Sequence, residues 1–189
     1  MEYFQRQQIS FDIAKLQDAT STLLSQVSWN KHVVKGVSMT QIPGDESSTN
    51  GDKLRGVFWT KPDATGMEVQ REKAIKESDY TQFVKEFKGT YFEEVYKKLS
   101  RYYIIGRFRL LLLEPRTSLS WHRDPEPRLH IPIFTNPGAH LCIHKGLKHL
   151  PADGGVWFTD TRKYHTVFNG GEENRIHLVA TYLGDRSTL

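Results

Sequence analysis

The second half of the chain consists of short apolar stretches separated by turn sequences, and this pattern restricts the folds open to it. Turn-forming residues gather at 136–138, 152–155 and 169–171, where Gly, Asn, Asp and Pro are frequent. Many short strands with such turns between them are typical of a β-sandwich or barrel. The predicted strands are residues 102–114, 119–122, 129–134, 141–144, 156–159, 164–169 and 176–183.

The first hundred residues instead have a helical pattern. Apolar residues recur at roughly helical spacing in residues 11–25 and 78–100. We expect Ser78 to be the N-cap of the second helix. Residues 42–56 are rich in Gly, Pro, Ser, Asp and Asn, which predicts a long loop.

Length and composition narrow the class of protein. A chain of 189 residues fits one domain, so we predict a single domain over 1–189, in which a helix-containing part, 1–100, packs on an all-β catalytic core, 101–185. Cys142 is the only cysteine and cannot form an internal disulfide, which favours a reducing compartment such as the cytoplasm. No apolar run approaches the length of a membrane span, and the N-terminus lacks the apolar core of a signal peptide.

The charge pattern gives only weak support for a nucleic-acid partner. The net charge is +4 and the sequence pI is about 9.1, a balance that permits binding to nucleic acid. However, charges of both signs are mixed along the chain, and no block of Lys and Arg reaches five residues. The more ordinary interpretation, a solvated surface of mixed charge, is therefore the stronger one.

Two of the predicted strands carry unusual polar residues on one face. Side chains alternate across a strand, so Arg128 and His130 share the face opposite the apolar residues of 129–133. Arg175 and His177 share a face in the same way. Such a face can simply meet solvent. Solvent faces are usually rich in Lys, Glu, Ser and Thr, whereas these carry His and Arg, which bind metals and carboxylates.

Three residues have the order of a metal site. His122 and Asp124 form an HxD motif, which is a weak signal alone, and His165 follows 43 residues after His122 on another predicted strand. Two histidines and one carboxylate in this order form the facial triad of non-haem iron(II) oxygenases, which leaves three coordination positions for a keto acid and dioxygen. Zinc more often takes three His, or Cys with His.

A fourth residue points to the co-substrate. Arg175 follows His165 by ten residues, with the turn at 169–171 between them, so strand pairing can bring both side chains into one cavity. A guanidinium group can bind the distal carboxylate of 2-oxoglutarate through two parallel hydrogen bonds. His122, Asp124 and His165 are therefore the predicted iron(II) ligands and catalytic residues, with 2-oxoglutarate and dioxygen as further reactants.

The stretch from about 107 to 185 resembles the aspartyl/asparaginyl β-hydroxylase family of 2-oxoglutarate-dependent oxygenases. The resemblance lies in the segments 121–124 (WHRD), 128–132 (RLHIP), 164–171 (YHTVFNGG) and 174–178 (NRIHL), and it covers roughly 80 of the 189 residues. It implies a double-stranded β-helix, or jelly-roll, core.

The resemblance also implies roles for single residues. His122 and His165 match the two iron-binding histidines, and Asp124 lies where many relatives have a carboxylate ligand. Arg175 matches the arginine that binds the distal carboxylate of 2-oxoglutarate. The pair Arg128 and His130 matches an Arg-x-His pair that helps to hold the same molecule. The chain departs from the pattern near Leu111, where some relatives have a hydroxyl group that assists the arginine.

The function that follows is hydroxylation of an unactivated C–H bond, with an amino acid, free or within a peptide or protein, as the substrate that the resemblance favours. Two alternatives stay open from the sequence. One is a jelly-roll binding module without catalysis, which would bind no iron and consume no 2-oxoglutarate. The other is a nucleic-acid demethylase of the same superfamily, which the basic pI permits.

Overall fold

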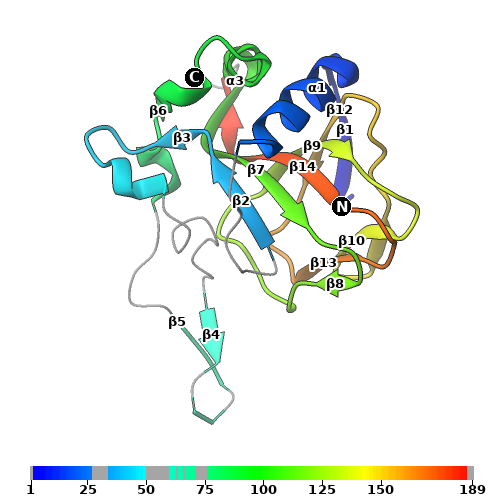
Figure 1. The fold of residues 1–189 in the computed structure, drawn as a ribbon. Helices are drawn as coiled ribbons and strands as arrows, with labels where there is room; N and C mark the ends of the chain where they lie inside the picture. Colours follow the sequence, from blue (N-terminus) through cyan, green and yellow to red (C-terminus); the bar gives the residue numbers. More distant parts are fainter. Residues whose placement is uncertain are drawn as a thin grey trace.

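The computed structural model describes residues 2–26, 34–49, 60–62, 64–65, 67–70 and 76–186. Two antiparallel sheets form a double-stranded β-helix (Figure 1), and this confirms the predicted fold class. The major sheet has the order β1 (Phe4–Ser10), β12 (Gly155–Thr159), β9 (Arg128–Phe134), β14 (Arg175–Asp185), β7 (Tyr103–Leu113) and β2 (Val34–Ser38). The minor sheet has the order β11 (Gly146–Lys148), β10 (Ala139–Ile143), β13 (His165–Asn169) and β8 (Thr117–Ser118).

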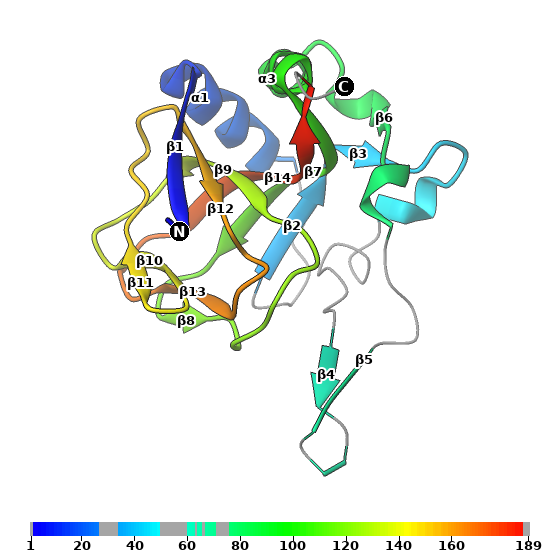
Figure 2. The same ribbon diagram turned by 180° about the vertical axis from the view of Figure 1, so that it is seen from behind.

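Two helices cover the outer face of the major sheet (Figures 1 and 2), as expected from the helical pattern of the N-terminal part. The helix α1 (Ile13–Leu24) lies against β9 and α3 (Tyr91–Tyr102) against β7. The apolar residues of alternate strand positions face these helices, since every second side chain points to the same side. Neither helix of the described chain has the length and hydrophobicity to cross a membrane. This outer core contains Leu16, Phe92, Val95, Leu99, Phe108, Leu110, Leu129, Ile131, Ile133, Ile176 and Leu178.

A second, smaller core lies on the inner side of the major sheet. It joins residues of both sheets, with Trp157 and Leu113 from the major sheet and Leu141, Ile143 and Val167 from the minor one. The polar residues that alternate with the outer core also point to this inner side. The inner face is therefore apolar in one part and strongly polar in another, and the polar part holds the candidate site.

Two strands of the major sheet come from the N-terminal part, where the sequence pattern indicated helices and loops. β1 pairs with β12 at the edge of the sheet, and β2 pairs with β7 at the other edge. The sequence of β1, FQRQQIS, buries only Phe4, so it lacks the alternation that identifies a strand. Shorter elements complete the described chain: β3 (Thr40–Gln41), β4 (Thr60–Pro62), β5 (Glu68–Gln70), β6 (Gln82–Phe83), η1 (Glu46–Thr49), η2 (Glu77–Asp79) and η3 (Lys85–Phe87).

The second helix is shorter than predicted. It begins at Tyr91 rather than near Ser78, because Gly89 has a φ of +77° that no helix accommodates and Thr90 is extended. The Gly89 N–H donates a hydrogen bond of 2.8 Å to the Glu93 carboxylate, which ties the residue before the N-cap, Thr90, to the first turn of the helix. Residues 78–87 instead form short 3₁₀ turns and β6, and their aromatic residues still pack on the outer core.

The strand predicted at 119–122 is also wrong. The regular pairing stops at β8, and only His122 forms an isolated bridge, with His165. In the predicted loop over 42–56, residues 46–49 form η1, and 50–56 lie outside the described residues.

Substitution of Gly154 tests how closely the backbone before β12 packs against the backbone after β1. It has a φ of +79°, and a Cβ added there would lie 2.0 Å from the carbonyl oxygen of Phe11, whose N–H donates to the Gly154 carbonyl at 2.9 Å. We expect Gly154→Ala to lower the free energy of unfolding by about 3 kcal/mol or more, the sum of a left-handed backbone and a steric clash. Denaturant unfolding measures this.

The matched control is Gly44→Ala. Gly44 has nearly the same φ, +77°, but no atom lies within 4 Å of the added Cβ. It should lose only the backbone part, roughly 1–2 kcal/mol. Equal losses at the two positions would contradict the clash at Phe11.

Candidate metal centre

The site begins with a backbone pairing that places two histidines side by side. The His122 N–H donates to the His165 carbonyl at 3.0 Å, and the His165 N–H donates to the His122 carbonyl at 2.9 Å. Directly paired residues of antiparallel strands project their side chains to the same side. The ring centroids are accordingly 4.2 Å apart, although the two residues are 43 positions apart in the chain.

Both imidazoles are held in the same tautomer. Nδ1 of His122 lies 2.7 Å from the Ser120 carbonyl oxygen, and Nδ1 of His165 lies 3.0 Å from the Lys163 carbonyl oxygen. A carbonyl oxygen only accepts, so Nδ1 carries the proton in each ring and Nε2 carries the lone pair. This is the usual arrangement of metal-binding histidines, whose second nitrogen donates to a backbone carbonyl.

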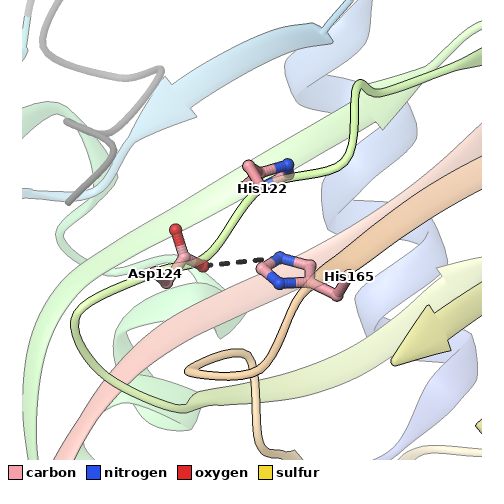
Figure 3. A group of neighbouring side chains, drawn as sticks. All are labelled: His122, Asp124 and His165. Atoms are coloured by element: carbon pink, nitrogen blue, oxygen red, sulfur yellow. Dashed lines mark ion pairs between the residues drawn. The ribbon is translucent and has the colours of Figure 1, made fainter. Parts of the chain in front are cut away.

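Asp124 completes the group (Figure 3). Its N–H donates to the Thr161 carbonyl at 2.9 Å, which fixes the backbone, and its carboxylate lies 3.7 Å from Nε2 of His165. Burial would raise the pKa of Asp124, but the Arg128 guanidinium and the two histidines hold it below its ordinary value. Burial lowers the pKa of His165 to about 4, so at pH 7 its lone pair is available to a metal.

The three side chains fit a divalent transition metal. One ligand atom from each lies within 4.8 Å of the others, and no other such group of three occurs among the described residues. Ligands on one face of an octahedron are separated by about 3 Å when metal–ligand bonds are about 2.1 Å, so small side-chain shifts bring all three to a common ion. Two neutral imidazoles and one carboxylate are the donor set of the non-haem iron(II) triad.

Behind Asp124, a buried network of charges holds the carboxylate. Nε of Arg128 lies 3.3 Å from the Asp124 carboxylate, and Nη2 of Arg128 lies 3.9 Å from the carboxylate of Glu77. Glu77 in turn accepts hydrogen bonds from the Arg107 backbone N–H at 3.0 Å and from its Nε at 2.9 Å. Burial opposes the charge on Glu77, yet Arg128 and Arg107 lower its pKa to about 2.

A second polar group lies on the inner face of β14 and β9. Nη2 of Arg175 lies 2.9 Å from Nδ1 of His177, and this nitrogen lies 3.4 Å from Nδ1 of His130. All three side chains are buried. Burial lowers the pKa of Arg175 to about 9, and no carboxylate among the described residues offsets the effect. Arg175 is therefore a buried cation without an anionic partner in the described part of the chain.

The structure thus divides the six predicted site residues into two groups. His122, Asp124 and His165 come together, and Arg128 joins them through Asp124 rather than standing beside Arg175. His130 belongs to the second group through its contact with His177, and burial, followed by the positive charges of Arg175 and Arg128, lowers its pKa well below 6.5. All six lie between residues 101 and 185, the predicted catalytic core.

Two buried charged residues near the site, Glu77 and Arg109, were not identified from the sequence. Glu77 lies in a 3₁₀ turn far from the motifs, and nothing in its sequence surroundings marks it as buried. Arg109 lies on the inner face of β7, where burial and then Arg107 lower its pKa to about 9. The alternation of Arg107 and Arg109 with Phe108 and Leu110 was the available signal, of the same kind as that in β9 and β14.

Comparison with known proteins gives a family match. Residues 71–183, more than half of the chain, match the family described as aspartyl/asparaginyl β-hydroxylase. No curated protein sequence matches the chain.

Solved structures are similar at a lower level. A 2OG-Fe(II) oxygenase-family oxidoreductase from Burkholderia pseudomallei is 22% identical over 42% of this chain and 43% of its own, with a TM-score of 0.38. The chain thus spans less than half of that protein. The viral collagen prolyl hydroxylase vCPH from Paramecium Bursaria Chlorella virus-1 is 13% identical over 95% and 97%, with a TM-score of 0.45. AviO1 from Streptomyces viridochromogenes Tue57 is 16% identical over 98% and 91%, with a TM-score of 0.47.

Glu77 offers a test of the buried charge network. Glu77→Gln keeps the shape but removes the charge that pairs with Arg107 and Arg128, and breaking a buried ion pair costs about 3–5 kcal/mol of stability. Since the pKa of Glu77 is lowered from 4.5 to about 2, its contribution is present above pH 4.5 and is lost as the pH falls toward 2. Urea unfolding at several pH values should show this extra acid sensitivity in the wild type only.

The control for this substitution is Glu172→Gln. Glu172 pairs with Arg116 on the surface, where its side chain is 75% exposed. Its loss should change stability little and leave the acid dependence unchanged. A Glu77→Gln protein as stable as this control would show that the network does not stabilise the fold.

Proposed function

Because the chain belongs to the aspartyl/asparaginyl β-hydroxylase family of 2-oxoglutarate-dependent hydroxylases, we propose that His122, Asp124 and His165 bind iron(II) and that Arg175 binds 2-oxoglutarate. The proposed reaction is hydroxylation of an unactivated C–H bond in an amino acid, either free or within a peptide or protein. The family supports a side chain of the aspartate or asparagine type. Residues 101–185 are the proposed catalytic core of a single domain, with the N-terminal part packed on it.

The observation that carries this proposal is the buried charge of Arg175 on the inner face of the major sheet, which also carries Arg128, the ion-pair partner of Asp124. A cation that is 5% exposed and has no carboxylate partner among the described residues is costly to bury. A dicarboxylate that binds the metal at one end and the guanidinium at the other would compensate this charge.

The residues of the chain have separate tasks in this reaction. When bound, iron(II) with 2-oxoglutarate and dioxygen supplies the oxidant for C–H hydroxylation. His165 presents a neutral Nε2 lone pair at pH 7, because burial lowers its pKa to about 4, and the Nδ1 contact of His122 with the Ser120 carbonyl leaves Nε2 of His122 as its metal-binding nitrogen. Arg128 holds the Asp124 carboxylate, which keeps one oxygen directed toward the histidines. His130 is the proposed neighbour of the co-substrate between the metal and Arg175.

The metal site is tested by anaerobic titration. Iron(II) and 2-oxoglutarate added to metal-free protein should produce the visible charge-transfer band of the chelate, and His165→Ala should abolish it because one of three ligands is lost. His144→Ala is the control, since the exposed His144 ring contacts Tyr3 and not the metal ligands. A band of wild-type intensity in His165→Ala would remove His165 from the site.

Arg175 is tested by its selectivity for the distal carboxylate. Arg175→Met should weaken 2-oxoglutarate binding to the iron-loaded protein at least tenfold, because a charge-assisted pair of hydrogen bonds is lost. Pyruvate has the same keto-acid end but no distal carboxylate, so its affinity should stay unchanged. The visible band measures both. Unchanged affinity for 2-oxoglutarate would show that another residue binds its distal end.

A further inference from the structure

His177 is in direct contact with Arg175, the proposed binding residue for 2-oxoglutarate. It is 1% exposed, and its Nδ1 lies 2.9 Å from Nη2 of Arg175. It occupies the inner face of β14, directly opposite Leu111 of β7 in the sheet register. Leu111 has no hydrogen-bonding side chain, so the residue of β7 opposite His177 cannot bond to Arg175. His177 is the side chain that accepts a hydrogen bond from the Arg175 guanidinium.

The direction of the hydrogen bond fixes the protonation of the ring. A guanidinium has donors only, so Nδ1 of His177 must accept, and the ring proton must lie on Nε2. The ring is neutral in this arrangement, and burial followed by the positive charge of Arg175 lowers its pKa well below 6.5. Because Arg175 occupies the one lone pair of His177 Nδ1, Nδ1 of His130 at 3.4 Å is a weaker, secondary contact of His177.

This arrangement restrains Arg175 from one side. One Nη2 hydrogen is directed to His177, which fixes the rotation of the planar guanidinium and leaves its other donors in a defined direction. The His177 ring is itself restrained, since the His130 ring meets it edge to face, with centroids 5.6 Å apart. Nε2 of His177 is buried and has no hydrogen-bond partner among the described residues. Among the described residues, the contacts of the ring therefore run through Nδ1 and the ring of His130.

We propose that His177 is a positioning residue for the co-substrate: its Nδ1 holds the Arg175 guanidinium in the orientation that binds the distal carboxylate of 2-oxoglutarate. The inference rests on the proposed function of Arg175. It predicts that His177 contributes to recognition of the distal carboxylate only, and that the contribution passes through Arg175. The metal ligands and the keto-acid end of the co-substrate should be insensitive to it.

Two amide substitutions separate the two ring nitrogens. In His177→Asn the amide oxygen can take the place of Nδ1 and accept from Arg175, whereas nothing replaces Nε2. In His177→Gln the amide nitrogen can take the place of Nε2, and the Nδ1 acceptor is lost. His177→Phe removes both and keeps the ring volume. Thermal unfolding of the three variants, each compared with the wild type, shows that the fold is retained.

The experiment is a titration of the iron(II)-loaded, anaerobic protein with 2-oxoglutarate and, separately, with pyruvate, followed by the visible band. His177→Phe and His177→Gln should raise the Kd for 2-oxoglutarate about tenfold, as expected when a hydrogen bond to a charged group is lost. His177→Asn should stay within about threefold of the wild type on the same reasoning. The Kd for pyruvate should be the same in all four proteins. In Arg175→Met, the further change His177→Phe should have no added effect.

Other results would overturn the inference. If His177→Phe binds 2-oxoglutarate as well as the wild type, His177 does not position Arg175. Rescue by Gln instead of Asn would give the role to Nε2, and an equal loss of pyruvate binding would show damage to the metal site. If the wild type gives no visible band with iron(II) and 2-oxoglutarate, the proposed function itself is wrong. If the wild type gives the band and the His177 variants bind 2-oxoglutarate with an unchanged Kd, only the role of His177 is wrong.

Discussion

The pairing of residues 119–124 with 161–167 is the interaction on which the site depends. Leu119 bonds to Val167, His122 bonds in both directions to His165, and the Asp124 N–H bonds to the Thr161 carbonyl. These bonds fix the distance between segments that are far apart in the chain. The segment 119–124 is not a regular strand, and these few backbone hydrogen bonds, with the isolated bridge between His122 and His165, hold it against residues 161–167. Without this pairing, the HxD motif would lie in an exposed loop with no second histidine beside it.

The inner face of the major sheet is a cationic surface whose compensation is uneven. Near His122 and His165, Glu77 and Asp124 compensate the buried Arg107 and Arg128. Near the start of β14, Arg175 has only neutral imidazole neighbours among the described residues. A low-polarity interior strengthens the interaction of a buried charge with its surroundings, so the uncompensated Arg175 should attract an anion more strongly than the paired arginines do. One layer of side chains therefore holds both the compensated charges next to the candidate metal site and the uncompensated charge of Arg175.

The strand pattern predicted the site better than the N-terminal half of the fold. Alternation placed Arg128, His130 and Arg175 on inner faces, because a strand has only two faces and the apolar residues mark the outer one. The spacing of His122, Asp124 and His165 predicted a group that the structure brings together. Their chemical roles stay predictions, since only the geometry is established.

Other features follow from contacts between distant residues and leave little mark on the local sequence. Glu77 resembles any surface acid in a turn, and only its position against β7 buries it. The helix predicted from Ser78 has the right apolar spacing, but Gly89 interrupts it, so the aromatic residues before Gly89 reach the core from 3₁₀ turns. The strand β1 has polar residues at most positions. It lies at the edge of the sheet and buries only its first residue, Phe4, so few of its side chains need to be apolar.

The position of β1 has a consequence for how the molecule forms. Phe4 pairs with Thr159, so the edge of the major sheet closes only when residues 155 positions apart have met. Contacts of such separation carry a large loop-closure entropy and slow the folding of β proteins. During synthesis, residues 4–10 cannot pair with β12 until most of the chain has left the ribosome. In that interval a nascent chain presents an unpaired strand edge, and the newly made protein is then most open to pairing with another chain.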